Sequence, residues 1–147
     1  MSGLTLAKAQ EILQRALDGP RTDDSRTVAI VIVDAGGHAL AMGREHAAPP
    51  LLSHIAEAKA KSCITYGKPT RTIMEWATET PIWFEGVSRV AQSRTGLPLI
   101  GSHGGVMIRD TNGALIGAVG VAGEAGHMDE RLAVLGIEGA GFTAQAE

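Results

Sequence analysis

The stretch GGVMIRDTNGALIGAVGVAG, residues 104–123, decides the fold that we expect for this chain. Two apolar runs are joined by Asp110–Gly113, a turn rich in residues that tolerate positive φ, and this pattern predicts a β-hairpin. The second run carries three glycines, at positions 117, 120 and 123. Glycine weakens the interior of a strand, so three of them indicate that backbone, a helix or a ligand approaches this surface closely. The hairpin is therefore a candidate wall of a site.

A second hairpin and several helices follow from the hydrophobic pattern of the remaining chain. Residues 28–33 form a continuous apolar, β-branched run that predicts a strand at the centre of a sheet. Asp34–Gly37 then turns the chain into a strand over residues 38–42. Helices are expected over residues 6–17, 51–66, 70–78 and 128–140, the first of them capped by Thr5. Residues 81–97 predict either a short helix or an irregular excursion.

The order of these elements predicts an α+β fold. Strands come in antiparallel pairs and do not alternate singly with helices, so we expect one antiparallel sheet with helices packed against it. A doubly wound dinucleotide fold is disfavoured, because neither Gly36-Gly37 nor the three glycines of the second hairpin open a helix, as a phosphate-binding fingerprint requires. The length of 147 residues suits a single domain over residues 1–147 with one core.

Composition narrows the classes of partner and compartment. A net charge of −3 and only five aromatic residues argue against nucleic acid as a partner. No run approaches the ~18 apolar residues of a membrane span, and no signal-peptide pattern is visible, so we expect no membrane association. The single cysteine, Cys63, fits a reducing compartment and favours the cytoplasm. No metal site is expected, because the histidines lack the ligand spacing of zinc sites and Cys63 has no partner.

Five blocks of the sequence, in order along the chain, resemble the GlcG/HbpS-like family, which includes the C-terminal domain of PduO-type proteins. These blocks are residues 33–37, the set Ser53, Ile55, Ala56, Lys59 and Ala60, residues 104–108, residues 117–123, and Asp129. The resemblance implies a profilin-like fold, with an antiparallel sheet of about five strands flanked by helices, assembled into homo-oligomers. Because some relatives bind or degrade heme and others are cobalamin-associated, it also implies heme or another tetrapyrrole as a candidate ligand. The chain departs from the family at Met107, where proline is usual, and at His103 and His127.

Lys59 is the residue whose chemistry is hardest to explain by packing alone. It lies four residues after Ile55 and four before Cys63, so it shares their helix face and can reach the interior or the wall of a cleft. A partly desolvated lysine has a lowered pKa and can clamp an anion or act as a base or nucleophile. The alternative is that its stem passes the apolar stripe and its ammonium ends in solvent.

Further polar residues flank the glycine-rich hairpin. Glu124, His127 and Asp129 gather after its second strand, where carboxylates either complement the dipole of the next helix or serve a site. His127 can act as an acid, a base or a ligand. His103 precedes the two glycines 104 and 105 in a loop, and it faces His127 if the two loops converge.

Two polar residues come from other parts of the chain. Asp34 either accepts backbone hydrogen bonds in its turn or orients Lys59 or a ligand. His54 directly follows Ser53 and can line a ligand cleft.

These residues support two functions of different classes. The first is a homo-oligomeric protein that binds a small ligand through the residues Asp34, His54, Lys59, His103, Gly104, Gly105 and Asp129. The second is a cofactor-independent enzyme of the isomerase, lyase or hydrolase type that acts on a small carboxylate metabolite. In that enzyme Lys59 holds the carboxylate as an anion clamp, and His127 or Glu124 moves a proton. A purely structural protein would leave these polar groups exposed and apart.

Overall fold

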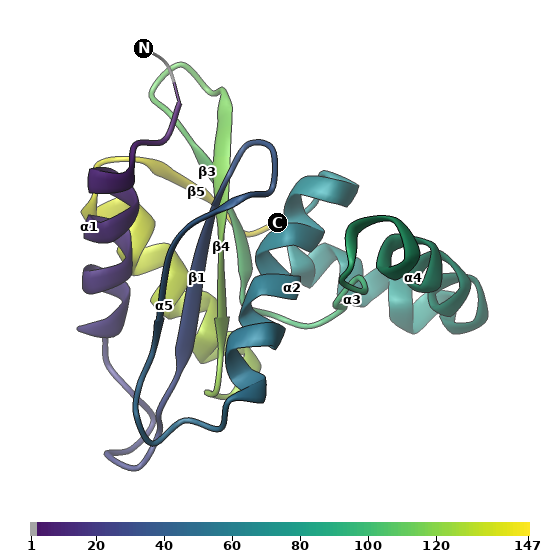
Figure 1. Ribbon diagram of the computed structural model, residues 1–147, viewed down its shortest axis with the longest axis horizontal. Helices are drawn as coiled ribbons and strands as arrows, with labels where there is room; N and C mark the ends of the chain where they lie inside the picture. The colour runs from purple at the N-terminus through teal and green to yellow at the C-terminus, as the bar shows by residue number, and fades with distance from the viewer. Residues whose placement is uncertain (1–2) are drawn as a thin grey trace.

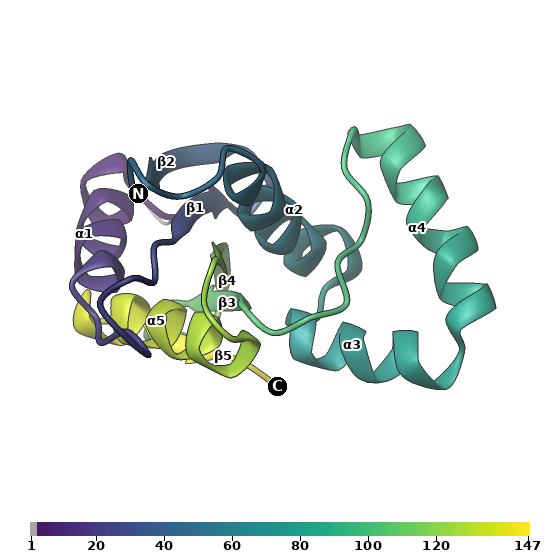
Figure 2. The same cartoon turned by 90° about the horizontal axis from the view of Figure 1, so that it is seen from below.

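The computed structural model describes residues 3–147, which fold around one five-stranded antiparallel sheet in the order β2-β1-β4-β3-β5. The strands are β1 (Ala29–Asp34), β2 (Ala39–Arg44), β3 (Gly105–Arg109), β4 (Leu115–Ala122) and β5 (Thr143–Gln145). Helices α1 (Leu6–Leu17) and α5 (Gly126–Gly139) cover one face of the sheet, and α2 (Leu51–Tyr66) covers the other (Figure 1). Beyond α2, helices α3 (Thr70–Glu79) and α4 (Pro81–Thr95) extend away from the sheet (Figure 2).

The predicted α+β class and both predicted hairpins are confirmed. β1 lies inside the sheet, since it pairs with β2 on one side and with β4 on the other. Its alternate residues feed two apolar layers, as a strand covered on both faces requires. Ile30 and Ile32 belong to the layer under α1 and α5, whereas Val31 and Val33 belong to the layer under α2.

The glycines of β4 let helix α2 lie directly on the strand. A Cβ built on Gly120 would stand 1.9 Å from the carbonyl oxygen of Ala56, which is far inside van der Waals contact. A Cβ on Gly117 would likewise meet the carbonyl oxygen of Val33 at 2.3 Å. The close approach that the glycines predict is therefore made by backbone of the protein itself.

Three details differ from the sequence-based expectations. Residues 81–95 form a regular helix, α4. None of its residues is fully buried, and its apolar face is limited to half-buried residues such as Phe84, Val87 and Ala91. Helix α5 begins at Gly126, two residues before the predicted start. The short strand β5 was not expected, because three residues paired only to β3 leave little pattern. None of the described helices is long and apolar enough to cross a membrane.

An aromatic cluster attaches the α3–α4 hairpin to the end of α2. The rings of Tyr66 and Trp76 stack with their centroids 4.5 Å apart and an interplanar angle of 16°. Trp76 also meets Phe84 of α4 edge-on, with centroids 5.2 Å apart. Such pairs contribute roughly 0.5–1.5 kcal/mol each beyond the apolar area that they bury. Four of the chain's five aromatic side chains lie in this hairpin and the adjoining end of α2, and the sheet core is built from aliphatic residues.

Candidate functional site

The ammonium of Lys59 lies inside the protein, where β3 begins and β4 ends. The residue is only 4% exposed. Its Nζ donates hydrogen bonds to the carbonyl oxygen of Val121, at 2.8 Å, and to Oδ2 of Asp129, at 3.3 Å. The helix spacing that placed Lys59 on the face of Cys63 thus directs it inward, and the alternative in which its ammonium reaches solvent does not apply.

Gly104 leaves the space that the lysine occupies. Its φ is +119°, and a Cβ built there would stand 2.9 Å from Nζ of Lys59 and 2.5 Å from the carbonyl oxygen of Val121. Only glycine adopts this backbone region without strain. Glycine is therefore required at position 104, directly before β3, because any side chain there would collide with Lys59 and with β4.

Burial opposes the charge on both members of this pair. It lowers the pKa of Lys59, while the attraction of Asp129 works in the opposite direction. Burial raises the pKa of Asp129 to about 6, against the opposing effects of Lys59 and of the backbone N–H of Glu124, which donates to Oδ1 at 2.9 Å. Two desolvated charges stabilise a fold little by themselves, but removing either one leaves the other without compensation.

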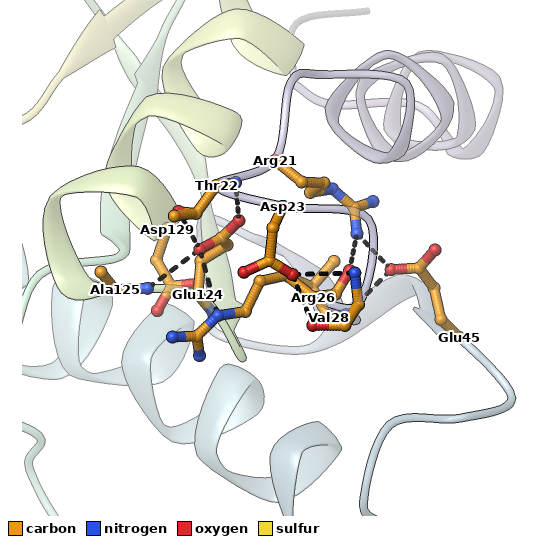
Figure 3. A network of polar contacts seen from close by, with 10 residues as sticks. Arg21, Thr22, Asp23, Arg26, Val28, Glu45, Glu124, Ala125 and Asp129 are labelled. Carbon is orange, nitrogen blue, oxygen red and sulfur yellow. Dashed lines mark hydrogen bonds and ion pairs between the residues drawn. The ribbon is translucent and has the colours of Figure 1, made fainter.

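Glu124 clamps the loop between α1 and β1 onto the start of α5 (Figure 3). Its carboxylate accepts hydrogen bonds from the backbone N–H and the hydroxyl of Thr22, both at 2.6 Å, and from the N–H of Ala125 at 3.2 Å. Arg26 Nε lies 3.9 Å away. Burial raises the pKa of Glu124, but the hydrogen bonds from Thr22 and Ala125 outweigh it, so the pKa is lowered. The carboxylate is held in its charged form.

A second set of polar contacts in the same loop was not predicted (Figure 3). Arg21 donates to Glu45 at 2.5 Å, to the carbonyl oxygen of Arg26 at 3.0 Å and to that of Leu17 at 2.8 Å. Glu45 also accepts from the backbone N–H of Val28 at 2.8 Å. The partners come from separate elements, and no spacing along the chain reveals such a network.

Histidines 103 and 127 flank the start of α5 but differ in exposure. The ring of His103 is half-buried beside Gly126, where a Cβ would stand 3.4 Å from its Nδ1. His127 is exposed in the first turn of the helix. Gly105 is held by a residue that sequence reasoning missed, since its N–H donates to the buried hydroxyl of Thr70 at 2.7 Å.

Asp34 and His54 lie apart from the buried pair. Asp34 is at the far end of β1, and its Oδ1 accepts from the backbone N–H groups of Gly36 and His38, as a turn-capping aspartate does. His54 is exposed on α2, where it lines a hollow of about 210 Å³ together with Met42 and Ser53. The structure thus brings together Lys59, Gly104, Glu124 and Asp129, and it places Asp34 and His54 at other positions on the surface.

The chemistry open to the buried cluster is limited by access. With Lys59 4% and Asp129 2% exposed, the buried pair offers almost no surface to a ligand. Within residues 3–147, no three side chains of the His, Cys, Asp or Glu type gather as a metal centre. Burial raises the pKa of Cys63 to about 12, so its thiol is not a ready nucleophile.

Comparison with known proteins adds a family to this geometry. The family model described as "Haem degrading protein HbpS-like" matches residues 4–138. Among the curated proteins, none matches the chain.

Three solved structures are similar to this chain over nearly its whole length. A double mutant of HbpS from Streptomyces reticuli is 25% identical, covers 96% of this chain and 89% of its own, and has a TM-score of 0.76. The Klebsiella pneumoniae protein ORFY is 27% identical, with 95% and 92% covered and a TM-score of 0.75. A PduOC:heme complex, at 20% identity, shares the fold with a TM-score of 0.82 over 98% of this chain and 99% of its own.

Proposed function

The chain belongs to the HbpS-like family of heme-degrading proteins, and on this premise we propose that it is a self-associating protein that binds heme or a closely related tetrapyrrole. The observation that carries the proposal is the family match over residues 4–138, which spans every element except β5. A similar structure of the same fold is described as a complex with heme. The heme-degrading activity in the family's description is not part of the proposal.

The side chains of this protein fit the needs of a heme. Heme presents a flat apolar ring, two carboxylates, and an iron that takes an imidazole as an axial ligand. His38, His54 and His127 expose imidazoles at three separate places, and Lys61 and Arg94 offer cations beside apolar surface. When bound, the iron would supply the redox chemistry, and the protein's residues would hold the ring and neutralise its carboxylates. Two histidines are among the residues predicted to bind a ligand. His54 is exposed and His103 is half-buried.

Self-association is supported by the surface of α4. Ile82 and Trp83, in its first turn, are 89% and 65% exposed, although both are large and apolar. Ile82 and Trp83 line a wide hollow of about 500 Å³. Exposed apolar surface of this kind usually marks an interaction site, and a second copy of the chain can cover it symmetrically. We place the interface between copies on this helix.

A second candidate function, catalysis on a small carboxylate metabolite, is favoured by the lowered pKa of Lys59 and by the nearby carboxylates Glu124 and Asp129. In this function Lys59 binds the substrate carboxylate and His127 or Glu124 moves the proton. The hydrogen bonds that Lys59 and Glu124 already make would have to be exchanged for contacts with the substrate. We therefore rank this function below tetrapyrrole binding.

Absorbance spectroscopy with hemin tests the binding function. Titrating the purified protein with hemin should produce a saturable shift of the Soret band relative to free hemin. A spectrum that stays the sum of its two components at every ratio would contradict tetrapyrrole binding.

Light scattering tests the assembly. The wild type should have a mass at micromolar concentration that is a multiple of 15.3 kDa, and Ile82→Glu should lower it. Leu6→Glu is the matched control, because Leu6 is an exposed apolar residue on a different helix. A monomeric wild type would contradict self-association, and an Ile82→Glu oligomer of full size would place the interface elsewhere.

A further inference from the structure

Two adjoining hollows lie between the C-terminal half of α2 and helix α4. The larger has a volume of about 310 Å³ and lies between the end of α2 and α4. The smaller, about 180 Å³, continues it toward the β1–β2 turn at Gly36–His38. Thr65 and Thr95 line both hollows, so the two form one groove, which we call the α2–α4 groove. Figure 2 shows α4 on the same side of the molecule as α2, with the segment that follows α4 passing between the two helices.

The larger hollow is mainly apolar. Val87, Val90 and Ala91 of α4 and Leu99 line it, together with the ring of Tyr66. Val90 is 61% and Tyr66 46% exposed, so this apolar surface is open to a ligand from solvent. Its volume alone reaches the lower end of the range of about 300–1,000 Å³ that is usual for small-molecule sites.

Two cations stand along the groove without carboxylate partners. Lys61 lines the smaller hollow and Arg94 the larger. Among residues 3–147, the ion pairs involve other lysines and arginines, and neither of these two side chains takes part in one. An apolar groove with two uncompensated cations is complementary to an apolar molecule that carries negative charge.

A histidine also lines the groove. His38 lines the smaller hollow, and its ring lies against Gly36, where a Cβ would stand 3.1 Å from Cδ2. In the described part of the chain its backbone N–H is bonded to Asp34, but its ring makes no hydrogen bond. An imidazole free of other contacts is available to ligate a metal that a ligand brings with it.

We propose that the α2–α4 groove is the tetrapyrrole site of this protein. The apolar side chains of α4 would pack against the porphyrin ring. Lys61 and Arg94 would form ion pairs with its carboxylates, and the imidazole of His38 would ligate the iron. This inference rests on the proposed function and adds its location and its residues. It differs from the sequence-based site, because none of these three polar residues is among those predicted to bind a ligand.

The inference is tested with two ligands that differ only in the metal, hemin and metal-free protoporphyrin IX. The wild type should bind both. His38→Ala should weaken hemin binding about tenfold or more and alter the Soret band, while leaving protoporphyrin IX binding unchanged. The double variant Lys61→Gln/Arg94→Gln should weaken both ligands about tenfold or more, since the carboxylates are common to the two.

Matched controls separate the groove from general surface effects. His46→Ala removes an exposed histidine from the loop after β2, and Arg89→Gln removes an α4 cation that is paired with Glu85. Both control variants should bind as the wild type does, and thermal unfolding should show that every variant is folded.

The outcomes distinguish the inference from the function on which it rests. If the wild type binds hemin and the His38 and Lys61/Arg94 variants bind it equally well, the groove is not the site, whereas heme binding stands. Loss of hemin binding on His54→Ala or His103→Ala in place of His38→Ala likewise overturns the groove. A wild type that binds neither ligand overturns both proposals.

Discussion

Lys59 and Asp129 form an ion pair that joins helix α2, on one face of the sheet, to the first turn of α5, which packs on the other. The pair passes the end of the sheet at which β3 begins and β4 ends, where Gly104 leaves room for it. It is buried, so its effect on the protein should be seen in stability before it is seen in binding.

Replacing Lys59 by methionine should destabilise the fold. Lys59→Met keeps most of the side-chain volume but leaves the Asp129 carboxylate buried without its partner, so the free energy of unfolding at pH 7.5 should fall by about 3 kcal/mol. Urea denaturation measures it. The double variant Lys59→Met/Asp129→Asn should recover part of the loss, because asparagine keeps the acceptor for the Glu124 N–H without the charge. A single variant as stable as the wild type would contradict this prediction.

Acidification should favour the wild type over Asp129→Asn. The folded-state pKa of Asp129 is raised from 3.8 to about 6, so between these values the folded protein holds a proton that the unfolded chain releases. The contribution of Asp129 to stability therefore rises as the pH falls through 6. Between pH 7.5 and 5 the difference in unfolding free energy between the two proteins should shift by about 1 kcal/mol toward the wild type. Denaturation curves at both pH values measure this, and a constant difference would rule it out.

Two glycine substitutions should have opposite signs. Gly120→Ala forces a Cβ against the backbone of α2 and should lower the free energy of unfolding by about 3 kcal/mol or more, or prevent folding. Gly86→Ala, in an exposed part of α4 with open space around the position, should raise it by roughly 0.5–1 kcal/mol. Thermal unfolding of both variants is the measurement. A neutral Gly120→Ala would mean that α2 does not lie on β4 as described.

Glu124 should control the loop before β1. Glu124→Gln weakens the acceptor for Thr22, so limited trypsin digestion should cut after Arg21 and Arg26 faster than in the wild type. Glu138→Gln, an exposed change on α5, the helix that follows Glu124, should leave the cleavage rate unchanged. Mass spectrometry of the fragments identifies the sites. Equal rates in the two variants would show that the clamp does not hold the loop.

Trp76 should hold α4 in place. Trp76→Ala removes both of its ring contacts, so the amides of residues 81–95 should exchange with deuterium faster, while those of β1 and β4 keep their protection. Gln92→Ala, which removes an exposed side chain of the same helix outside the cluster, is the control. Faster exchange throughout the sheet would instead indicate global destabilisation.

The sequence predicts best what local patterns encode. The hairpins, the central position of β1 and the helix face on which Lys59 lies all follow from periodicity and from turn residues. Helix α4 could not be assigned firmly, because its apolar face is short and none of its residues is fully buried. The contacts of Arg21 with Glu45 and of Thr70 with Gly105 join distant segments, and no local pattern shows them.

The site was predictable only in part. Lys59, Glu124 and Asp129 could be grouped because they surround the glycine-rich hairpin. Their burial and their saturation with hydrogen bonds depend on how α2 and α5 pack around the sheet, which a single sequence does not reveal. The sequence predicts His38 as the first residue of a strand, and only the packing of the β1–β2 turn near the ends of α2 and α4 brings it to a groove.

The position of β4 beside β1 has a consequence for the order of folding. These two inner strands come from opposite halves of the chain, with Ala29 paired to Ala122. Closing so long a loop is entropically unfavourable, and folding slows as contacts become more distant in sequence. During synthesis, β1 can pair with β2 soon after both have emerged, but its other edge waits until most of the chain has been made. Until β4 has been made, the nascent first half of the chain therefore exposes one apolar edge of β1. This half is the part of the chain most in need of a chaperone.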